Sequence, residues 1–321
     1  MKLTRRVFGQ GVAAGAAALA MPGLLRAQSA WPSRPITYVI PFNPGGESDV
    51  TARFQQPHME RITGQSVVIS SRPGAGGATA WAQLNGLEAD GHTIMNTIVP
   101  HTILQPAMND VGYQTDDIHN VYFFHYTPDA VIVPTSSPFE TLEEMIAFAT
   151  ENPGALTLGG SGTHTANHLA AVTLGSLTGA TVTYVPFSGS APAMAAVLGG
   201  QIGGGMSYTT QSVGAGEQVR TLAVATEERV PALPDVPTFR ELGIDHIGGA
   251  YRGVAVPAAT PEDIKQRLSD LIGEVNALPE FQAQMEEAGY VVTDIPLAEV
   301  PAFLEARKAD YAPAIDLFRS A

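Results

Sequence analysis

Residues 36–53 constrain the fold of this chain more than any other part of its sequence. An apolar run suited to a β-strand leads into Pro-Gly-Gly at residues 44–46, and Ser48 then stands where a helix can begin. Gly45 and Gly46 favour backbone conformations that other residues avoid, and the first N–H groups of a helix have no partner within it. The segment therefore predicts a strand, a tight turn and a helix whose N-terminus can hold an anion.

The same alternation of strand and helix continues along the chain. Short β-rich runs predict strands at residues 36–41, 66–70, 93–98, 155–158, 181–185 and 221–225. Helical patterns lie between most of them, and Thr141 and Thr260 are helix-start signals because each is followed by an acid three residues later. Pro57 predicts a kink or an early end in the first helix. Strands separated by helices predict an α/β fold with largely parallel sheets.

Two extended runs, residues 121–133 and 250–256, are long enough to pass from one lobe of the molecule to another. If both cross, residues 28–127 and 251–321 form the first lobe, and residues 128–250 form the second. Open α/β sheets bind ligands beyond the carboxyl ends of their strands. A binding cleft is therefore expected between the two lobes.

The first 27 residues have the pattern of a secretory signal peptide. Basic residues precede an apolar run rich in Ala and Gly, which ends in residues suited to cleavage near Ala27. The pair Arg5 and Arg6 fits a twin-arginine signal, and the same basic residues also fit the general secretory route. The sequence therefore predicts an exported protein from which residues 1–27 are removed.

The chain without that segment is strongly acidic. Four of its 17 basic side chains are lost, and the remaining 13 stand against 31 acidic ones, a formal charge of −18. This charge repels nucleic acid and anionic lipid, so neither is an expected partner. Because the sequence contains no cysteine, it excludes disulfides, a thiolate nucleophile and zinc sites built on cysteine.

Three glycine-rich turns, at residues 44–49, 73–77 and 159–165, each follow a predicted strand and precede a predicted helix. The first two lack the Gly-Lys-Ser/Thr ending of a phosphate-binding loop, which disfavours nucleotide binding. The third lacks the second glycine of a Gly-x-Ser-x-Gly elbow, which disfavours hydrolase chemistry. His164 and His168 have the spacing of many zinc sites, but no third ligand is evident, so a capping or orienting role is favoured.

Short motifs throughout the mature chain occur in a specific order, at residues 31–36, 41–49, 72–77, 152–154, 161–168, 185–190, 233–238 and 241–243. In this order they resemble the periplasmic solute-binding receptors of tripartite tricarboxylate transporters, often called the Bug family. The resemblance implies a two-lobed α/β periplasmic-binding-protein fold, similar to type II, with two crossover strands as the hinge. It also implies a monomeric receptor in the periplasm, not an enzyme, that delivers a small carboxylate to membrane transporter subunits.

The resemblance also implies which residues contact the ligand. In such receptors, the turns that match residues 43–49 and 161–165 hold a ligand carboxylate from opposite lobes, partly through ordered water. The expected ligand-binding residues are Phe42, Asn43, Gly45, Gly46, Glu47, Ser48, Asp49, Ala75, Gly76, Thr97, Ser161, Gly162, Thr163, His164, Thr165, Phe187, Ser207 and Tyr208. Neither a cofactor nor a metal ion is expected.

Two departures from the family's pattern concern the choice of ligand. His164 stands where relatives usually have glycine, so it is expected to donate a hydrogen bond to a carboxylate or to narrow the pocket. Ser207 and Tyr208 stand where amino-acid-binding relatives commonly place an acid. A ligand without an amino group is therefore expected, such as a dicarboxylic or aromatic acid.

Two alternative functions remain open from the sequence. One is an exported enzyme on the same scaffold, a hydrolase or isomerase that uses His164 or His168 with Asp49. The other is a sensor receptor that presents its closed form to a signalling protein.

Overall fold

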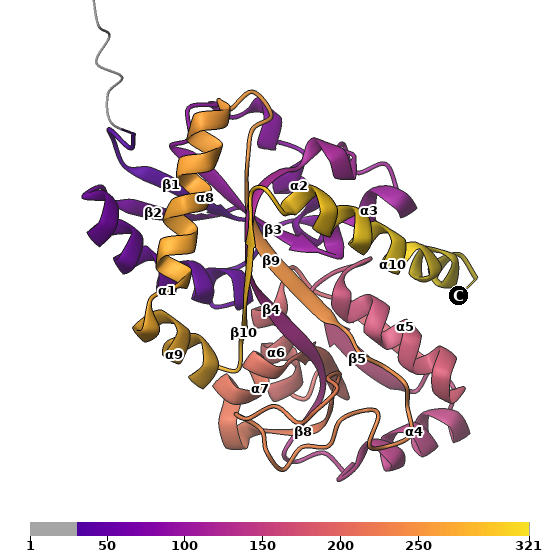
Figure 1. Ribbon diagram of the computed structural model, residues 1–321. Helices are drawn as coiled ribbons and strands as arrows, with labels where there is room; N and C mark the ends of the chain where they lie inside the picture. The colour runs from indigo at the N-terminus through magenta and orange to yellow at the C-terminus, as the bar shows by residue number, and fades with distance from the viewer. Residues whose placement is uncertain (1–30, 321) are drawn as a thin grey trace, which may run out of the picture.

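The structure is a computed structural model that describes residues 31–320. The predicted signal peptide, residues 1–27, lies outside the described residues. Strands and helices alternate along the chain and form a two-lobed α/β fold in which one curled sheet of ten strands extends through both lobes (Figure 1). Among the described residues, no helix is both long and apolar enough to cross a membrane.

The first lobe contains a parallel group of three strands, β1 (Ile36–Ile40), β2 (Val67–Ser71) and β3 (Thr93–Val99). The central strand of this group is β1, which pairs in parallel with both of the others. The helices of this lobe are α1 (Glu47–Thr63), α2 (Ala78–Trp81), α3 (His101–Met108), α8 (Glu262–Asn276) and α9 (Pro279–Glu287). A core cluster that includes Tyr38 and Trp81 fills the space between them.

The second lobe repeats this plan with a separate set of elements. Its strands are β5 (Leu156–Gly160), β6 (Val182–Pro186), β7 (Gly204–Tyr208) and β8 (Val219–Val224). Its helices are α4 (Leu142–Glu151), α5 (Ala166–Thr178), α6 (Ser190–Leu198) and α7 (Thr209–Ala215). A second core cluster, which includes Met145 and Phe239, lies in this lobe.

Two long strands, β4 (His119–Pro134) and β9 (Gly249–Val256), connect the lobes. The first part of β4 pairs with β9 as far as Pro128, and from Asp129 onwards it pairs with β7. A further strand, β10 (Val291–Pro296), also pairs with the first part of β4. This change of partners supports the proposed division of the chain near residues 127/128 and 250/251.

The last helix, α10 (Val300–Ser320), contacts both lobes. It packs against α3 of the first lobe and α5 of the second, and Figure 1 shows it running between them. The proposed first lobe includes all of residues 251–321, and within it α10 is the helix that also reaches the second lobe. The physical reason is its length, because a helix of 21 residues extends for about 30 Å and reaches past the lobe where it begins.

The structure confirms the six predicted strands to within about two residues at each end. It also confirms the first helix-start signal, since the Thr141 side chain accepts a hydrogen bond from the N–H of Glu144. The second signal also marks a helix start, since α8 begins at Glu262, but Pro261 stands at the N-cap position and no side chain caps the helix. Pro57 does not end α1 early, and its exposed position leaves water free to bond the carbonyl group that loses its partner.

Candidate functional site

A small closed cavity lies between the lobes, beside the connecting strand β9. Its walls come from both lobes and from β9, and they are Phe42, Glu47, Ser48, Ile98, His101, Ser161, Ser190, Tyr208 and Arg252. The cavity has a volume of about 10 Å³, which is close to the space of one water molecule. The lobes are thus closed on each other, and a ligand of several atoms enters only if they move apart.

Three helices begin at this cavity. Glu47, His101 and Ser190 are the first residues of α1, α3 and α6, and all three line the cavity. These helices follow the carboxyl ends of β1, β3 and β6, which brings their N-termini to the same region. The N-terminus of a helix carries a partial positive charge and N–H groups without an intrahelical partner. The local field of the cavity therefore favours an anion.

Several polar side chains of the cavity are buried without a hydrogen-bond partner in residues 31–320. Those able to donate are the Ser48 and Tyr208 hydroxyl groups, the His101 ring and Arg252 Nε. Burial, and then the nearby Arg252, hold the pKa of His101 well below its ordinary value, so the ring is neutral. An unsatisfied buried donor costs about 1–3 kcal/mol, so these walls suit a ligand rich in acceptor atoms.

Glu47 and Arg252 place opposite charges in the cavity. Both side chains are 2 % exposed, and Arg252 Nη1 lies 3.8 Å from Glu47 Oε2. The guanidinium also donates from Nη1 to Thr127 Oγ1 at 2.8 Å and lies over the Tyr208 ring, 4.8 Å from its centroid. Burying either charge alone would be costly, so each side chain stabilises the other in this position.

Glu47 also connects the first lobe to the second. Its Oε1 accepts hydrogen bonds from the hydroxyl group of Thr210 and from Gln211 Nε2, both on α7. Its backbone N–H donates to Ser190 Oγ on α6 at 3.3 Å. One residue at the start of α1 thereby makes polar contacts with two helices of the opposite lobe.

The turn before α1 has its left-handed residue at Gly45, where φ is 79°. Gly46 has a φ of −84° and a ψ of 173°, an extended conformation open to any residue, so the expectation of an unusual backbone at Gly46 is wrong. Space is the constraint there, because a Cβ atom at Gly46 would lie 3.1 Å from Ser190 Oγ. Asp49 accepts a hydrogen bond from the Gly45 N–H at 2.9 Å and pairs with Arg53, so its carboxylate stabilises the turn.

The turn before α5 contributes Ser161 to the cavity. The N–H and the hydroxyl group of Ser161 both donate to Asn167 Oδ1, at 3.1 and 2.6 Å, so these donors are already used within the second lobe. Gly162, with a φ of 120°, packs directly against Gly76 of the first lobe. A Cβ atom at Gly162 would lie 2.8 Å from Gly76 Cα, so the lobes meet here through bare backbone.

The structure places His164 outside the walls of the closed cavity. Its ring packs edge-on against Phe318 of α10, with centroids 5.1 Å apart, and its Nδ1 lies 3.1 Å from Asn109 Nδ2. His164 and His168 instead line a separate cavity of about 590 Å³ between α5 and the end of α10. His164 is expected from the sequence to bond a ligand carboxylate or to narrow the pocket, and in the closed form its ring packs on the C-terminal helix instead.

Five of the predicted ligand-binding residues line the closed cavity, namely Phe42, Glu47, Ser48, Ser161 and Tyr208. The remaining predicted residues do not line it; they are Asn43, Gly45, Gly46, Asp49, Ala75, Gly76, Thr97, Gly162, Thr163, His164, Thr165, Phe187 and Ser207. Within residues 31–320, no group of three or more His, Cys, Asp or Glu side chains could hold a metal ion.

The sequence analysis missed four cavity residues, Ile98, His101, Ser190 and Arg252. The signal for Arg252 was present, because it is the one charged residue in the apolar run at 250–256, where burial requires a partner. His101 stands three residues after the predicted strand 93–98, at the edge of the sheet where ligands are expected.

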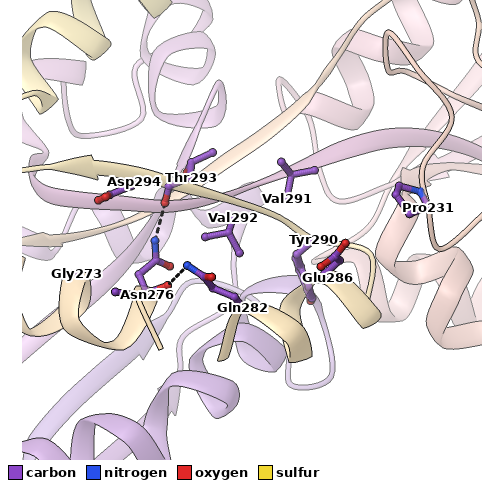
Figure 2. A pocket seen from close by; sticks show the side chains of 11 residues that line it. Pro231, Gly273, Asn276, Gln282, Glu286, Tyr290, Val291, Val292, Thr293 and Asp294 are labelled. Atoms are coloured by element: carbon purple, nitrogen blue, oxygen red, sulfur yellow. Dashed lines mark hydrogen bonds between the residues drawn. The ribbon is translucent and has the colours of Figure 1, made fainter. Parts of the chain in front are cut away.

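Another cavity, of about 550 Å³, lies beside β10 and the ends of α8 and α9 (Figure 2). Asn276 donates to the Thr293 carbonyl oxygen at 2.8 Å, and Gln282 donates to the Asn276 carbonyl oxygen at 3.1 Å, as Figure 2 shows. The charged side chains among its described walls are Glu286 and Asp294, both acidic. Two carboxylates repel an anion, so the closed cavity is the better candidate site for an acid.

Solved structures with the same fold define the class of protein. MatC from Rhodopseudomonas palustris, determined with bound malate, is 25 % identical, with a TM-score of 0.82 over 88 % of this chain and 99 % of that one. Rpa4515 from R. palustris, determined with adipate, is 27 % identical, with a TM-score of 0.84 over 89 % of this chain and 98 % of that one. The periplasmic binding protein BugD is also similar, with 26 % identity and a TM-score of 0.82 over 90 % of this chain and 98 % of that one. The fold is that of solute-binding receptors, not of an enzyme.

Sequence comparison gives the family. Residues 51–304 match the model of the tripartite tricarboxylate transporter family receptor. The UPF0065 protein in the tcbD-tcbE intergenic region of Pseudomonas sp. strain P51 is 33 % identical over 288 residues, which cover 87 % of this chain and 85 % of that protein. The chain belongs to the tripartite tricarboxylate transporter receptor family, which confirms the resemblance found in its motifs.

Proposed function

We propose that this protein captures a small organic carboxylate, a dicarboxylic or aromatic acid, between its lobes in the periplasm. It then delivers the acid to the membrane subunits of a tripartite tricarboxylate-type transporter. The observation that carries this proposal is the closed cavity where three helix N-termini meet the buried Arg252. These groups supply the local positive potential that an acidic protein needs to bind an anion. The malate and adipate held by the related receptors support the same ligand class.

Binding energy is used for closure of the lobes. In the closed form, Glu47 contacts α6 and α7, and Gly162 contacts Gly76 across the cleft. A ligand that bridges the lobes stabilises this form relative to an open one, and a transporter can distinguish the two forms. The receptor acts as a monomer after removal of residues 1–27.

The charges in the cavity favour a ligand without an amino group. The expectation from the sequence rests on Ser207 and Tyr208, where no acid is present, but Glu47 brings a carboxylate to the cavity from the opposite lobe. Arg252 lies 3.8 Å from Glu47 Oε2 and balances its charge, so the cavity offers no uncompensated carboxylate to an ammonium group. A ligand without an amino group therefore remains the proposal.

A panel of ligands tests this function by thermal unfolding and calorimetry. The panel contains malate, succinate, adipate, benzoate, aspartate and glutamate. At least one acid without an amino group is expected to stabilise the protein, by about 2.7 kcal/mol when its concentration is 100 times Kd. Stabilisation by aspartate or glutamate alone would contradict the ligand class. Uptake of the identified acid by cells with and without the receptor gene tests delivery to the transporter.

A further inference from the structure

Arg252 is the strongest feature of the cavity that the two turns do not explain. Its side chain is 2 % exposed, and the residue lies on β9, opposite Ile98 of β3 and His125 of β4. The guanidinium therefore belongs to a connecting strand and not to the turn at residues 43–49 or the turn at residues 161–165. A buried guanidinium carries five N–H donors, and leaving them unpaired is unfavourable.

The partners of Arg252 within the described chain use only part of this capacity. Nη1 donates to Thr127 Oγ1 at 2.8 Å, whereas Nε has no partner in residues 31–320. The distance of 3.8 Å from Nη1 to Glu47 Oε2 is too long for a hydrogen bond. Glu47 thus balances the charge of the guanidinium but leaves the edge that carries Nε unoccupied.

The other side chains near Arg252 fix its position and add donors. The Tyr208 ring lies against the guanidinium, with 4.8 Å between its centroid and Cζ, and the Tyr208 hydroxyl group has no partner in the described part of the chain. Glu47 is itself fixed by Thr210 and Gln211, which prevents it from turning fully toward Arg252. A planar carboxylate matches the planar guanidinium edge through two parallel hydrogen bonds.

We propose that Arg252 is a second carboxylate subsite and the residue that selects a dicarboxylate over a monocarboxylate. One carboxylate of the ligand lies at the helix N-termini near Ser48 and Ser161, and the other pairs with Arg252 and the Tyr208 hydroxyl group. This inference rests on the proposed function, because it assumes that the closed cavity binds an organic acid. An aromatic monocarboxylate would leave one of the two subsites without an anion.

Matched pairs of acids test the subsite by calorimetry. The probes are succinate with butyrate, and adipate with hexanoate, because each pair differs by one carboxylate at constant chain length. The wild type is expected to bind the dicarboxylate of at least one pair more tightly. Arg252→Lys keeps the charge but removes the planar fork, and is expected to weaken dicarboxylate binding roughly 10-fold.

A second variant removes the charge without leaving Glu47 unpaired. The double variant E47Q/R252Q keeps the cavity neutral, and is expected to weaken binding of the dicarboxylate roughly 100-fold. Binding of the matched monocarboxylate is expected to weaken less than binding of the dicarboxylate, because the monocarboxylate loses only the local positive potential of Arg252 and not a direct contact with it. Arg267→Gln, at an exposed position on α8, is the matched control and is expected to leave both affinities unchanged.

Different results would overturn different conclusions. If the variants lose the same factor of affinity for both acids of a pair, Arg252 only maintains the shape of the cavity. This result would overturn the subsite while the receptor function stands. Unchanged dicarboxylate affinity in the double variant would do the same. If the wild type binds none of the four acids and none of the wider carboxylate panel, the proposed function fails together with the subsite.

Discussion

The turn before α1 and the turn before α5 both reach the closed cavity, but they contribute to it in different ways. The first turn supplies charged and polar groups, since Glu47 and Ser48 line the cavity and Glu47 contacts α6 and α7. The second turn supplies a close backbone contact, at Gly162, and one lining residue, Ser161, whose donors are already used. The difference indicates that the first turn recognises charge and the second sets how closely the lobes approach.

The largest effect is expected for Glu47→Ala in the first turn. The substitution leaves the buried Arg252 without its counter-charge and removes the acceptor of Thr210 and Gln211. Because removing one partner of a buried ion pair leaves an uncompensated charge, the free energy of unfolding is expected to fall by about 3–5 kcal/mol. Urea denaturation at neutral pH measures this change.

The matched control for Glu47 is Glu143, an exposed acid in the first turn of α4. Glu143→Gln is expected to change the free energy of unfolding by less than about 0.5 kcal/mol. If Glu47→Ala and Glu143→Gln lower the free energy of unfolding by the same amount, the first turn has no special charged role and does not differ from the second in this respect.

The second effect concerns Gly162 in the other turn. An alanine there would place Cβ 2.8 Å from Gly76 Cα, so the lobes could not close to the present distance. Overpacking of this kind typically costs 1–3 kcal/mol, so ligand affinity is expected to fall about 30-fold, which is about 2 kcal/mol. Calorimetry measures the affinity, and X-ray scattering in solution measures whether saturating ligand still makes the molecule more compact.

Gly179 provides the control for backbone strain. It has a φ of 74°, and a Cβ atom there would meet no atom within 4 Å, so Gly179→Ala adds strain without a contact between lobes. This control is expected to lower stability by about 1 kcal/mol and to leave affinity unchanged. Equal affinity losses in both variants would mean that strain, not closure, explains the effect of Gly162→Ala.

Much of the fold was accessible from the sequence because its strands are local apolar runs bounded by glycine-rich turns. Two strands were not predicted, β10 and β7 (Gly204–Tyr208), and the first two residues of β7 are glycines with low β propensity. This strand depends on its neighbours, since it pairs with both β4 and β5. A Cβ atom at Gly205 would lie 3.0 Å from the Ile132 side chain, so the glycine is required by packing that no local pattern reveals.

The site was less accessible, because it combines residues whose proximity depends on strand register. Arg252 enters the cavity because β9 pairs with β3 and β4 in a register that sets it opposite Ile98 and His125. His164 lies in the turn before α5, and the direction of its ring depends on Phe318, more than 150 residues later. Motifs located the turns, whereas long-range packing decided which side chains face the cavity.

A third, smaller effect is a pH dependence at His168, in the helix that follows the second turn. Burial, and then the neighbouring His164, lower the pKa of His168 to about 4, below the ordinary value of 6.5. The unfolded state therefore binds a proton more readily between pH 6.5 and 4, and stability falls as the pH decreases through this range. The free energy of unfolding of the wild type is therefore expected to fall between pH 7 and pH 5. With allowance for the partial exposure of the ring, His168→Gln is expected to make this fall smaller by about 1 kcal/mol.

Urea denaturation at pH 7 and pH 5 measures this difference. The ring of His168 stacks on Tyr184, with centroids 4.3 Å apart, so the variant also loses a packing contact at both pH values. Comparing the change with pH, and not the stability at one pH, separates the proton effect from the packing effect. Identical pH dependence in wild type and variant would remove His168 as its source.

The smallest effect is expected for His164→Gly. His164 has a φ of 54°, a conformation that costs a side chain roughly 1 kcal/mol, and glycine would relieve it. The same substitution removes the contacts of the ring with Phe318 and Asn109, which offset that gain. The net change in the free energy of unfolding is expected to stay within about 0.5 kcal/mol.

Ligand affinity distinguishes the two possible roles of this position. Because the His164 ring lies outside the cavity walls, His164→Gly is expected to keep the ligand profile of the wild type, with affinities within about threefold. Asn109→Ala is the control, since it removes the polar partner of the ring without changing the backbone. If His164→Gly changes the order of ligand affinities and Asn109→Ala does not, the His164 ring takes part in ligand recognition. Both turns would then recognise the ligand.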